Sequence, residues 1–418
     1  MTDLTTVAAH PSIDSTPAAP PTQRVMSVDV LRGFDMFWIL GADSLVNALN
    51  RMSQTAPTQF LATQLEHAEW EGFHFYDLIF PLFVFLVGVS LVYSLTKLLE
   101  HGGRIEALKR VFRRSFLLFI IALIYSGGFS NSWPDIRLMG VLNRIALCYF
   151  FGGVTFCFVP PRGMVAVATG LLLGYWGLLA WVPFPDVRPV AGGNQVISKE
   201  AGFTNVAQLN FTSTQMLRGS YIQGVNLTDY LDQRFLPGRK YDGTYDPEGI
   251  LSTMPAVATC LLGIFAGLLL RNTVEDDKQK VIYLLSAGVA GVAVGFLWGL
   301  EFPVIKKIWT SSYVLVAGGF SSILLGLFYW AVDVLKYRKW CQPFVWIGMN
   351  SITVYLANTL LGGFGNRLAR RLAGGDVQKF FDQYVAQGAG SLVLSITGLF
   401  LAIWFCHFLY RRKIFLRL

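Results

Sequence analysis

Charged residues are scarce in this 418-residue chain, because only 14% are Asp, Glu, Lys or Arg, whereas 53% are hydrophobic. Ordinary soluble domains carry about a quarter of their residues as charges, so this composition argues against one. It favours a protein that crosses a membrane several times. The net charge of +8 does not indicate nucleic-acid binding, because the basic residues stand in the gaps between apolar runs.

Cysteine and histidine are scarce as well. The five cysteines lie in or at the ends of apolar runs, and the polar loops contain none. Neither a disulfide framework nor a Cys-x-x-Cys metal site is therefore predicted. His67 and His74 could share a helical face, but no third ligand follows at metal-binding spacing. The sequence predicts no metal site.

The apolar runs predict an all-α fold, a polytopic transmembrane helical bundle of about ten spans. Residues 1–23, rich in Thr, Ala, Pro and Ser, are expected to be a disordered cytoplasmic tail, and residues 24–418 the transmembrane domain. The polar stretch 183–248 is expected to form an external loop subdomain. The candidate spans are roughly 34–50, 75–96, 115–128, 138–158, 164–182, 250–270, 281–299, 312–335, 343–361 and 390–410.

The basic residues predict the orientation. Short basic connections follow the second, fourth, sixth and eighth candidate spans, and a basic segment ends the chain. All of them fall on the side of the N-terminus, so the positive-inside rule predicts that both termini are cytoplasmic. Two groups oppose the rule: Lys306 with Lys307, and Arg367 with Arg370 and Arg371.

The segment from His67 to Asp77 (HAEWEGFHFYD) places ionisable side chains directly against an apolar run. A group that exchanges protons at the edge of a membrane is a functional candidate. The residues alone leave two interpretations open, because His67 either does chemistry or joins Trp70 in the polar-aromatic belt at the bilayer surface. On the predicted topology this segment and the loop 183–248 share the external side and could form one site.

Ionisable residues inside spans are costly, so Asp35, Asp43 and Arg144 are expected either to line a polar cavity or to pair across helices. Guanidinium groups suit the phosphates of a large anionic ligand that enters from the cytoplasm. Arg113 and Arg114 also fit a simpler role, in which they anchor the helix ends on the cytoplasmic side. The candidates for phosphate binding are Arg32, Arg113, Arg114 and Arg144.

Two short polar motifs stand at the starts of the sixth and ninth candidate spans. In the first, Asp246 and Glu248 suit a helix start, or they contact a sugar or an amine. In the second, Asn350 and Ser351 join neighbouring helices, or they contact a ligand that crosses the bundle.

Five motifs, in this order, resemble the heparan-alpha-glucosaminide N-acetyltransferase family. They are Arg24–Gly33 (RVMSVDVLRG), His67–Phe85 (HAEWEGFHFYDLIFPLFVF), Gly140–Arg144 (GVLNR), Tyr245–Gly249 (YDPEG) and Gly348–Ser351 (GMNS). The resemblance covers nearly the whole chain from about residue 24. Some bacterial relatives in this family are described as N-acetylglucosamine-related transporters.

The resemblance implies an enzyme that takes acetyl from cytoplasmic acetyl-CoA and places it on a glucosamine amine across the membrane. The family's catalytic histidine lies in a His-x-x-Trp-x-Gly motif and maps onto His67. A polar residue of the first span, Asn in the lysosomal enzyme, falls at Asp43, which would orient His67, hold the substrate ammonium, or do both. The resemblance also makes Trp70, Glu71, Asp246 and Glu248 candidates for acceptor binding, although Glu71 replaces an Asn of the family's motif.

The implied cosubstrate is acetyl-CoA, with no metal. Its expected binding residues are Arg32, Arg113, Arg114, Arg144, Asn350 and Ser351. The expected partners are an amino-sugar or glycan acceptor, membrane lipid and a second copy of the chain in a homodimer, without nucleic acid. We expect an integral protein of a bacterial inner membrane, acting towards the periplasm. The alternative is an inner-membrane transporter of N-acetylglucosamine or a related sugar, although no internal repeat is evident.

Overall fold

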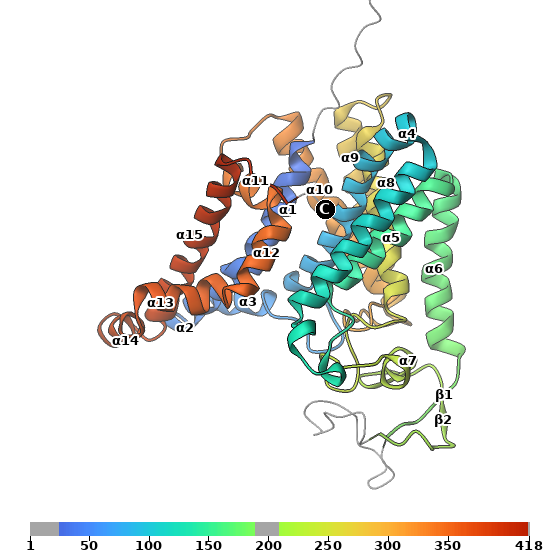
Figure 1. Cartoon of the computed structure of the whole chain (residues 1–418), viewed down its shortest axis with the longest axis horizontal. Coiled ribbons are helices and arrows are strands. Elements are labelled where there is room, and N and C mark those ends of the chain that lie inside the picture. Colours follow the sequence, from blue (N-terminus) through green and yellow to red (C-terminus); the bar gives the residue numbers. More distant parts are fainter. Residues whose placement is uncertain (1–24, 189–208, 417–418) are drawn as a thin grey trace, which may run out of the picture.

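The computed structural model describes residues 25–188 and 209–416. The described chain is almost entirely helical, which confirms the all-α polytopic class (Figure 1). Two short antiparallel strand pairs, β1 (Phe184–Pro185) with β2 (Met216–Leu217) and β3 (Tyr221–Ile222) with β4 (Val225–Asn226), stand between α6 and α8. The helices are α1 (Met26–Phe37), α2 (Asp43–Met52), α3 (Ala56–Gln64), α4 (Ile79–Tyr125), α5 (Val141–Phe158), α6 (Pro161–Trp181), α7 (Leu227–Phe235), α8 (Thr253–Arg271), α9 (Asp277–Gly299), α10 (Ser311–Tyr329), α11 (Gln342–Met349), α12 (Ser351–Leu360), α13 (Ala369–Ala373), α14 (Gly375–Tyr384) and α15 (Ala389–Arg411).

Seven helices of the described chain are long and apolar enough to cross a membrane. One of them, α4, contains two of the predicted spans. A straight helix of its 47 residues would be about 70 Å long, more than twice the hydrocarbon core of a bilayer. The backbone turns at Gly103, where φ is 73°, and Ile79 and Tyr125 from its two ends line one cavity. We therefore treat α4 as two antiparallel arms.

The predicted spans 34–50 and 343–361 are interrupted helices. A π-helical segment, Trp38–Ala42, separates α1 from α2, and Gly41 in it has φ 126°, which L side chains rarely adopt. In the second case the helix breaks at Asn350, between α11 and α12. Apolar patterning predicted both as continuous because it does not register a local change of backbone conformation.

The first helices of these two pairs, α1 and α11, cross at very close range. A Cβ added at Gly33 would lie 1.8 Å from the carbonyl oxygen of Phe344, and one added at Gly348 would lie 1.9 Å from that of Asp29. Glycine at both positions therefore permits the crossing, as small residues do between membrane helices.

Both ends of the described chain lie at the same end of the bundle. Val30 of α1 is buried in a cluster with Val332, from just beyond α10, and Val345 of α11, and Tyr410 near the end of α15 packs against this cluster. The shared location fits an even number of crossings. That this end faces the cytoplasm remains a prediction, and the tail 1–23 lies outside the described residues.

The opposite end of the bundle carries the described part of the long loop. Phe184 and Leu227 of the loop are buried in one cluster with Tyr175 of α6 and with Phe302 and Ile305 from the α9–α10 connection. Figure 1 shows α7 and the strands β1 and β2 below the ends of the long helices, where the chain leading to His67 also lies. The loop therefore forms one wall of the region that contains the candidate site.

Candidate active site

A cavity of about 450 Å³ opens at this end of the bundle. Its apolar wall comes from α1 and the π-helical segment after it, both arms of α4, α5 and α12. Ionisable and hydroxyl-bearing residues from four distant parts of the sequence also line it. Among them are His67, Tyr76, Arg137, Tyr241, Glu248, Lys306 and Lys307.

His67 is held by a buried carboxylate. Its Nδ1 lies 2.9 Å from Oδ1 of Asp77, whose side chain is only 1% exposed, whereas 52% of the His67 side chain is exposed. The backbone N–H groups of Ala68 and His74 donate to the other oxygen of Asp77, so the loop is folded around this carboxylate. When Nδ1–H donates to Asp77, the neutral imidazole keeps its lone pair on Nε2, which can accept a proton or attack a carbonyl.

Lys306 lies against the same pair. Its Nζ is 3.3 Å from Oδ1 of Asp77, and it is 2.9 Å and 3.2 Å from Nδ1 and Nε2 of His67. An atom nearly equidistant from both ring nitrogens cannot lie along either lone pair, so its attraction is chiefly to Asp77. Burial lowers the pKa of Lys306, and the Asp77 carboxylate opposes this shift. The lysine therefore brings a partly desolvated amine to within hydrogen-bonding distance of the imidazole.

Asp43 was expected to contact His67 directly, but Tyr76 lies between the two side chains. Its carboxylate accepts hydrogen bonds from Ser44 (3.4 Å) and from the hydroxyl of Tyr76 (3.4 Å), and the Tyr76 ring lies 4.9 Å from the ring of His67. Asp77, to which sequence reasoning gave no role, makes the contact expected of Asp43. A carboxylate immediately before an apolar run was the available signal, because such a group needs a partner.

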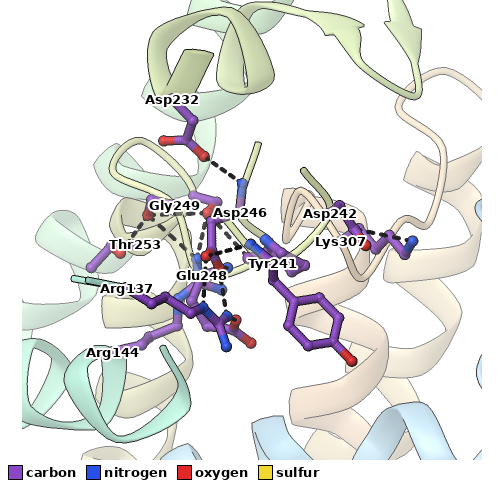
Figure 2. Close-up of polar contacts among 12 residues, drawn as sticks. Arg137, Arg144, Asp232, Tyr241, Asp242, Asp246, Glu248, Gly249, Thr253 and Lys307 are labelled. Atoms are coloured by element: carbon purple, nitrogen blue, oxygen red, sulfur yellow. Dashed lines mark hydrogen bonds and ion pairs between the residues drawn. The ribbon is translucent and has the colours of Figure 1, made fainter. Parts of the chain in front are cut away.

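Arg137 brings together the two carboxylates expected near the acceptor (Figure 2). Its Nε and Nη2 donate to the two oxygens of Asp246 at 2.8 and 2.7 Å, and Nη2 also donates to Glu248 at 2.6 Å. Burial raises the pKa of Glu248, although the Arg144 and Arg137 guanidinium groups oppose this. Sequence reasoning missed Arg137, because it lies in a polar connection more than 100 residues before its partners.

Tyr241 presents an aromatic face beside this cluster. Its ring lies 4.9 Å from the Arg137 guanidinium and its backbone N–H donates to Asp246 at 3.1 Å. Next to Tyr241, Asp242 forms an ion pair of 3.2 Å with Lys307, which fixes this part of the loop. In Figure 2 the Tyr241 ring projects away from the carboxylates, and the residue is 62% exposed. The backbone hydrogen bond to Asp246 and the contact with Arg137 fix the position of the Tyr241 ring. An exposed aromatic ring in a fixed position is suited to packing against a ligand.

Three other expected site residues have structural contacts. Arg144 is fully buried, donates to the carbonyl of Gly249 and to Ser252, and lies over the Trp309 ring, so it pairs across helices. Trp70 donates its Nε1–H to the carbonyl of Tyr221 at 2.8 Å, and Glu71 forms a backbone bridge with Ile305. Trp70 and Glu71 therefore hold the His67 segment against the loop and the α9–α10 connection.

The remaining residues expected to bind acetyl-CoA are spread over the bundle. Arg32 donates to Ser90, and Arg114 lies over the Tyr149 ring, with a buried Nε that has no hydrogen-bond partner in the described chain. Arg113 is exposed on α4. Asn350 is buried at the break between α11 and α12, while Ser351, next to it, lines the cavity. The structure thus brings one of these candidates, Ser351, to the cavity.

The described residues contain no group of three or more His, Cys, Asp or Glu arranged to hold a metal ion.

Comparison with known proteins finds one matching family model and two similar curated proteins. Residues 24–187 match the family model described as heparan-alpha-glucosaminide N-acetyltransferase, catalytic. The human heparan-alpha-glucosaminide N-acetyltransferase is 29% identical over 389 residues, which cover 84% of this chain and 55% of the relative. The mouse protein of the same name is 28% identical over 330 residues, covering 72% of this chain and 50% of the relative. The chain thus spans about half the length of these curated relatives, and the matches confirm the resemblance that the five motifs predicted: the chain is similar to the heparan-alpha-glucosaminide N-acetyltransferases over most of its length.

Proposed function

We propose that the protein is a transmembrane acetyltransferase that moves acetyl from cytoplasmic acetyl-CoA to the amine of a glucosamine-type sugar on the opposite, periplasmic side of a bacterial inner membrane. The observation that carries the proposal is the His67–Asp77 pair on the wall of a cavity. The activity in the relatives' name supports the reaction type.

Transfer to an amine forms a C–N bond and breaks the C–S bond of the thioester. The nitrogen loses one proton, and CoA leaves as a thiolate that takes up a proton to become the free thiol. A neutral amine is the nucleophile, so a base must take up the proton that the nitrogen loses, and histidine is the usual choice. His67 performs this step through Nε2, while Asp77 orients the ring and stabilises the imidazolium. Two routes remain open, because His67 either deprotonates the amine directly or first carries the acetyl group as an acetyl-imidazole.

Lys306 stabilises the negative charge that forms on the carbonyl oxygen of the thioester. Its Nζ is 3.2 Å from Nε2 of His67, so a carbonyl attacked near Nε2 also approaches the ammonium. A donor aimed at a developing oxyanion contributes more in a desolvated site than in water. The lysine thereby explains one of the two exceptions to the positive-inside rule.

The acceptor sugar binds between Tyr241 and the carboxylates. A pyranose ring packs on the exposed face of Tyr241, and Glu248, at the cavity wall, receives the ammonium. Asp246 holds Arg137 and the Tyr241 backbone in place. Asp43 acts on His67 through Tyr76, and Trp70 and Glu71 keep the His67 segment against the loop.

Acetyl-CoA reaches the cavity from the end of the bundle that carries both ends of the described chain. Ser351 and the apolar walls contact the acyl-bearing arm, and Asn350 lies at the helix break beside it. For the phosphates we propose Arg32, Arg113 and Arg114, with Arg144 holding the protein around the cavity. The buried Nε of Arg114, without a hydrogen-bond partner in the described chain, supports an anion near that residue.

A sugar transporter is the second candidate. The interrupted helix pairs α1–α2 and α11–α12, which meet where α1 crosses α11, favour it, because transporters often build substrate sites from such helices. No sequence repeat accompanies them.

One experiment separates the two functions. Detergent-purified protein is mixed with acetyl-CoA and glucosamine, and free CoA is measured. The enzyme releases CoA in repeated turnovers only when the sugar is present, and the His67→Ala variant, folded as judged by its thermal unfolding, does not turn over. Uptake of unmodified sugar into proteoliposomes without acetyl-CoA would instead establish transport.

A further inference from the structure

Three arginines take no part in the proposed site. Arg367, Arg370 and Arg371 are exposed on a continuous helical stretch made of the π-helical segment Gly363–Leu368 and α13. Their spacing places them on one face of this stretch, whereas Ala369, on the other side, is fully buried. Within residues 25–188 and 209–416, none of the three has a carboxylate at ion-pair distance. The face is therefore a cluster of three available guanidinium groups.

Large apolar side chains are exposed beside the arginines. Leu372, next to Arg371, is 65% exposed, and Phe380 and Tyr384 of α14 are 55% and 69% exposed. The rings of Phe380 and Tyr384 lie 5.0 Å apart, one helical turn from each other, and so form one aromatic face. A soluble surface seldom combines such residues with a basic cluster, but helices in the membrane interface commonly do.

The position of these helices fits the interface. Asp382 of α14 accepts hydrogen bonds from the backbone N–H groups of Gly388 and Gly390. Gly388 precedes α15 and Gly390 is its second residue, and α15 is long and apolar enough to cross a membrane. Figure 1 shows α13 and α14 at the end of the bundle where α2 and α3 also lie. The pair is thus fastened where an apolar span begins, at the depth of lipid headgroups.

We propose that α13 and α14 form a docking surface for anionic phospholipid headgroups in the leaflet at the His67 end of the bundle. The three arginines bind the lipid phosphates, for which guanidinium is geometrically suited, and Leu372, Phe380 and Tyr384 enter the boundary of the acyl chains. The surface accounts for the second exception to the positive-inside rule, because these arginines bind lipid instead of setting the topology. The proposal does not depend on the acetyltransferase activity.

A nitroxide label on Leu372→Cys tests the proposal at the site itself. The five native cysteines are all buried, which favours labelling of the introduced one. In nanodiscs of phosphatidylglycerol, we expect the label to be more accessible to oxygen than to an aqueous nickel chelate. In nanodiscs of phosphatidylcholine, this preference weakens. The same label on Val274→Cys, in an exposed loop at the other end, should remain aqueous in both.

Lipid binding by the purified protein provides the second measurement. Native mass spectrometry with the two lipids should show preferential retention of phosphatidylglycerol. The triple variant Arg367→Gln, Arg370→Gln, Arg371→Gln should bind phosphatidylglycerol at least about tenfold more weakly than the wild type. The matched triple variant with Lys at the same three positions should retain most of the preference. Inorganic phosphate should not displace the lipid, because it lacks the acyl chains. An aqueous Leu372→Cys label in phosphatidylglycerol nanodiscs, or wild-type protein without lipid preference, would overturn the proposal.

Discussion

Asp77, and not Asp43, is the carboxylate that contacts His67, with 2.9 Å between Oδ1 of Asp77 and Nδ1 of the histidine. Asp43 is connected to the ring through Tyr76. The two aspartates therefore differ in how directly they can set the orientation and tautomer of His67.

This difference predicts unequal effects of two matched substitutions. Asp77→Asn should lower kcat by about 100- to 10,000-fold, because an amide neither fixes the same tautomer nor stabilises an imidazolium. Asp43→Asn should lower kcat much less, because Asp43 is connected to His67 only through Tyr76. Steady-state rates of CoA release give the comparison, and equal losses in the two variants would contradict the assignment of Asp77.

Substitution of Lys306 tests its proposed contact with the oxyanion. Lys306→Met should lower kcat by about 100- to 1,000-fold, the effect typical of losing one such donor. Lys306→Arg should recover part of the rate because it restores a cation. Lys307→Met serves as the matched control, since Lys307 pairs with Asp242 of the loop instead of with Asp77. A Lys306→Met enzyme as fast as the wild type would exclude this role.

Tyr241 should govern the binding of the acceptor and not that of the donor. Tyr241→Ala is expected to raise KM for glucosamine by about tenfold, since aromatic contacts contribute on the order of 1 kcal/mol. The KM for acetyl-CoA should stay the same. Tyr241→Phe keeps the aromatic face and should behave like the wild type. An increase in the KM of acetyl-CoA alone would show that Tyr241 contacts the donor.

The pH dependence of stability should change when Asp232 is replaced. Burial raises the pKa of this carboxyl to about 7 from an ordinary value of 3.8, and it accepts a hydrogen bond from the N–H of Ile250 at 2.9 Å. The folded protein thus holds a proton that the unfolded chain releases between about pH 4 and pH 7. The contribution of Asp232 to stability is full below about pH 4 and is lost as the pH rises through 7.

Asn cannot ionise, so Asp232→Asn removes this loss. The Tm of the variant minus that of the wild type should be more positive at pH 8 than at pH 5, when both are measured in one detergent. Equal differences at the two pH values would show that Asp232 has no raised pKa in the folded protein.

Much of the fold could be predicted from the sequence because burial in a membrane requires long apolar runs. The runs from α5 to α10 and in α15 correspond to single helices. The breaks at Gly41 and Asn350 could not be predicted in the same way, because they depend on backbone geometry and on the close crossing of α1 and α11.

The candidate site was predictable only in part. His67 stood out because of its place beside an apolar run, and topology put it on the same side as the loop that carries Glu248. The contributions of Arg137, Tyr241 and Lys306 depend on contacts between segments far apart in the chain, which periodicity and composition do not encode.

The most direct test of the account is acetyl transfer across a sealed membrane. Proteoliposomes enclose glucosamine, and labelled acetyl-CoA is added to the outer solution. It reaches only those protein molecules whose donor-binding end faces outward. The account predicts labelled N-acetylglucosamine inside the vesicles with wild-type protein and none with His67→Ala. Equal amounts of enclosed product from both proteins, or unmodified sugar crossing the membrane without any acetyl transfer, would contradict it.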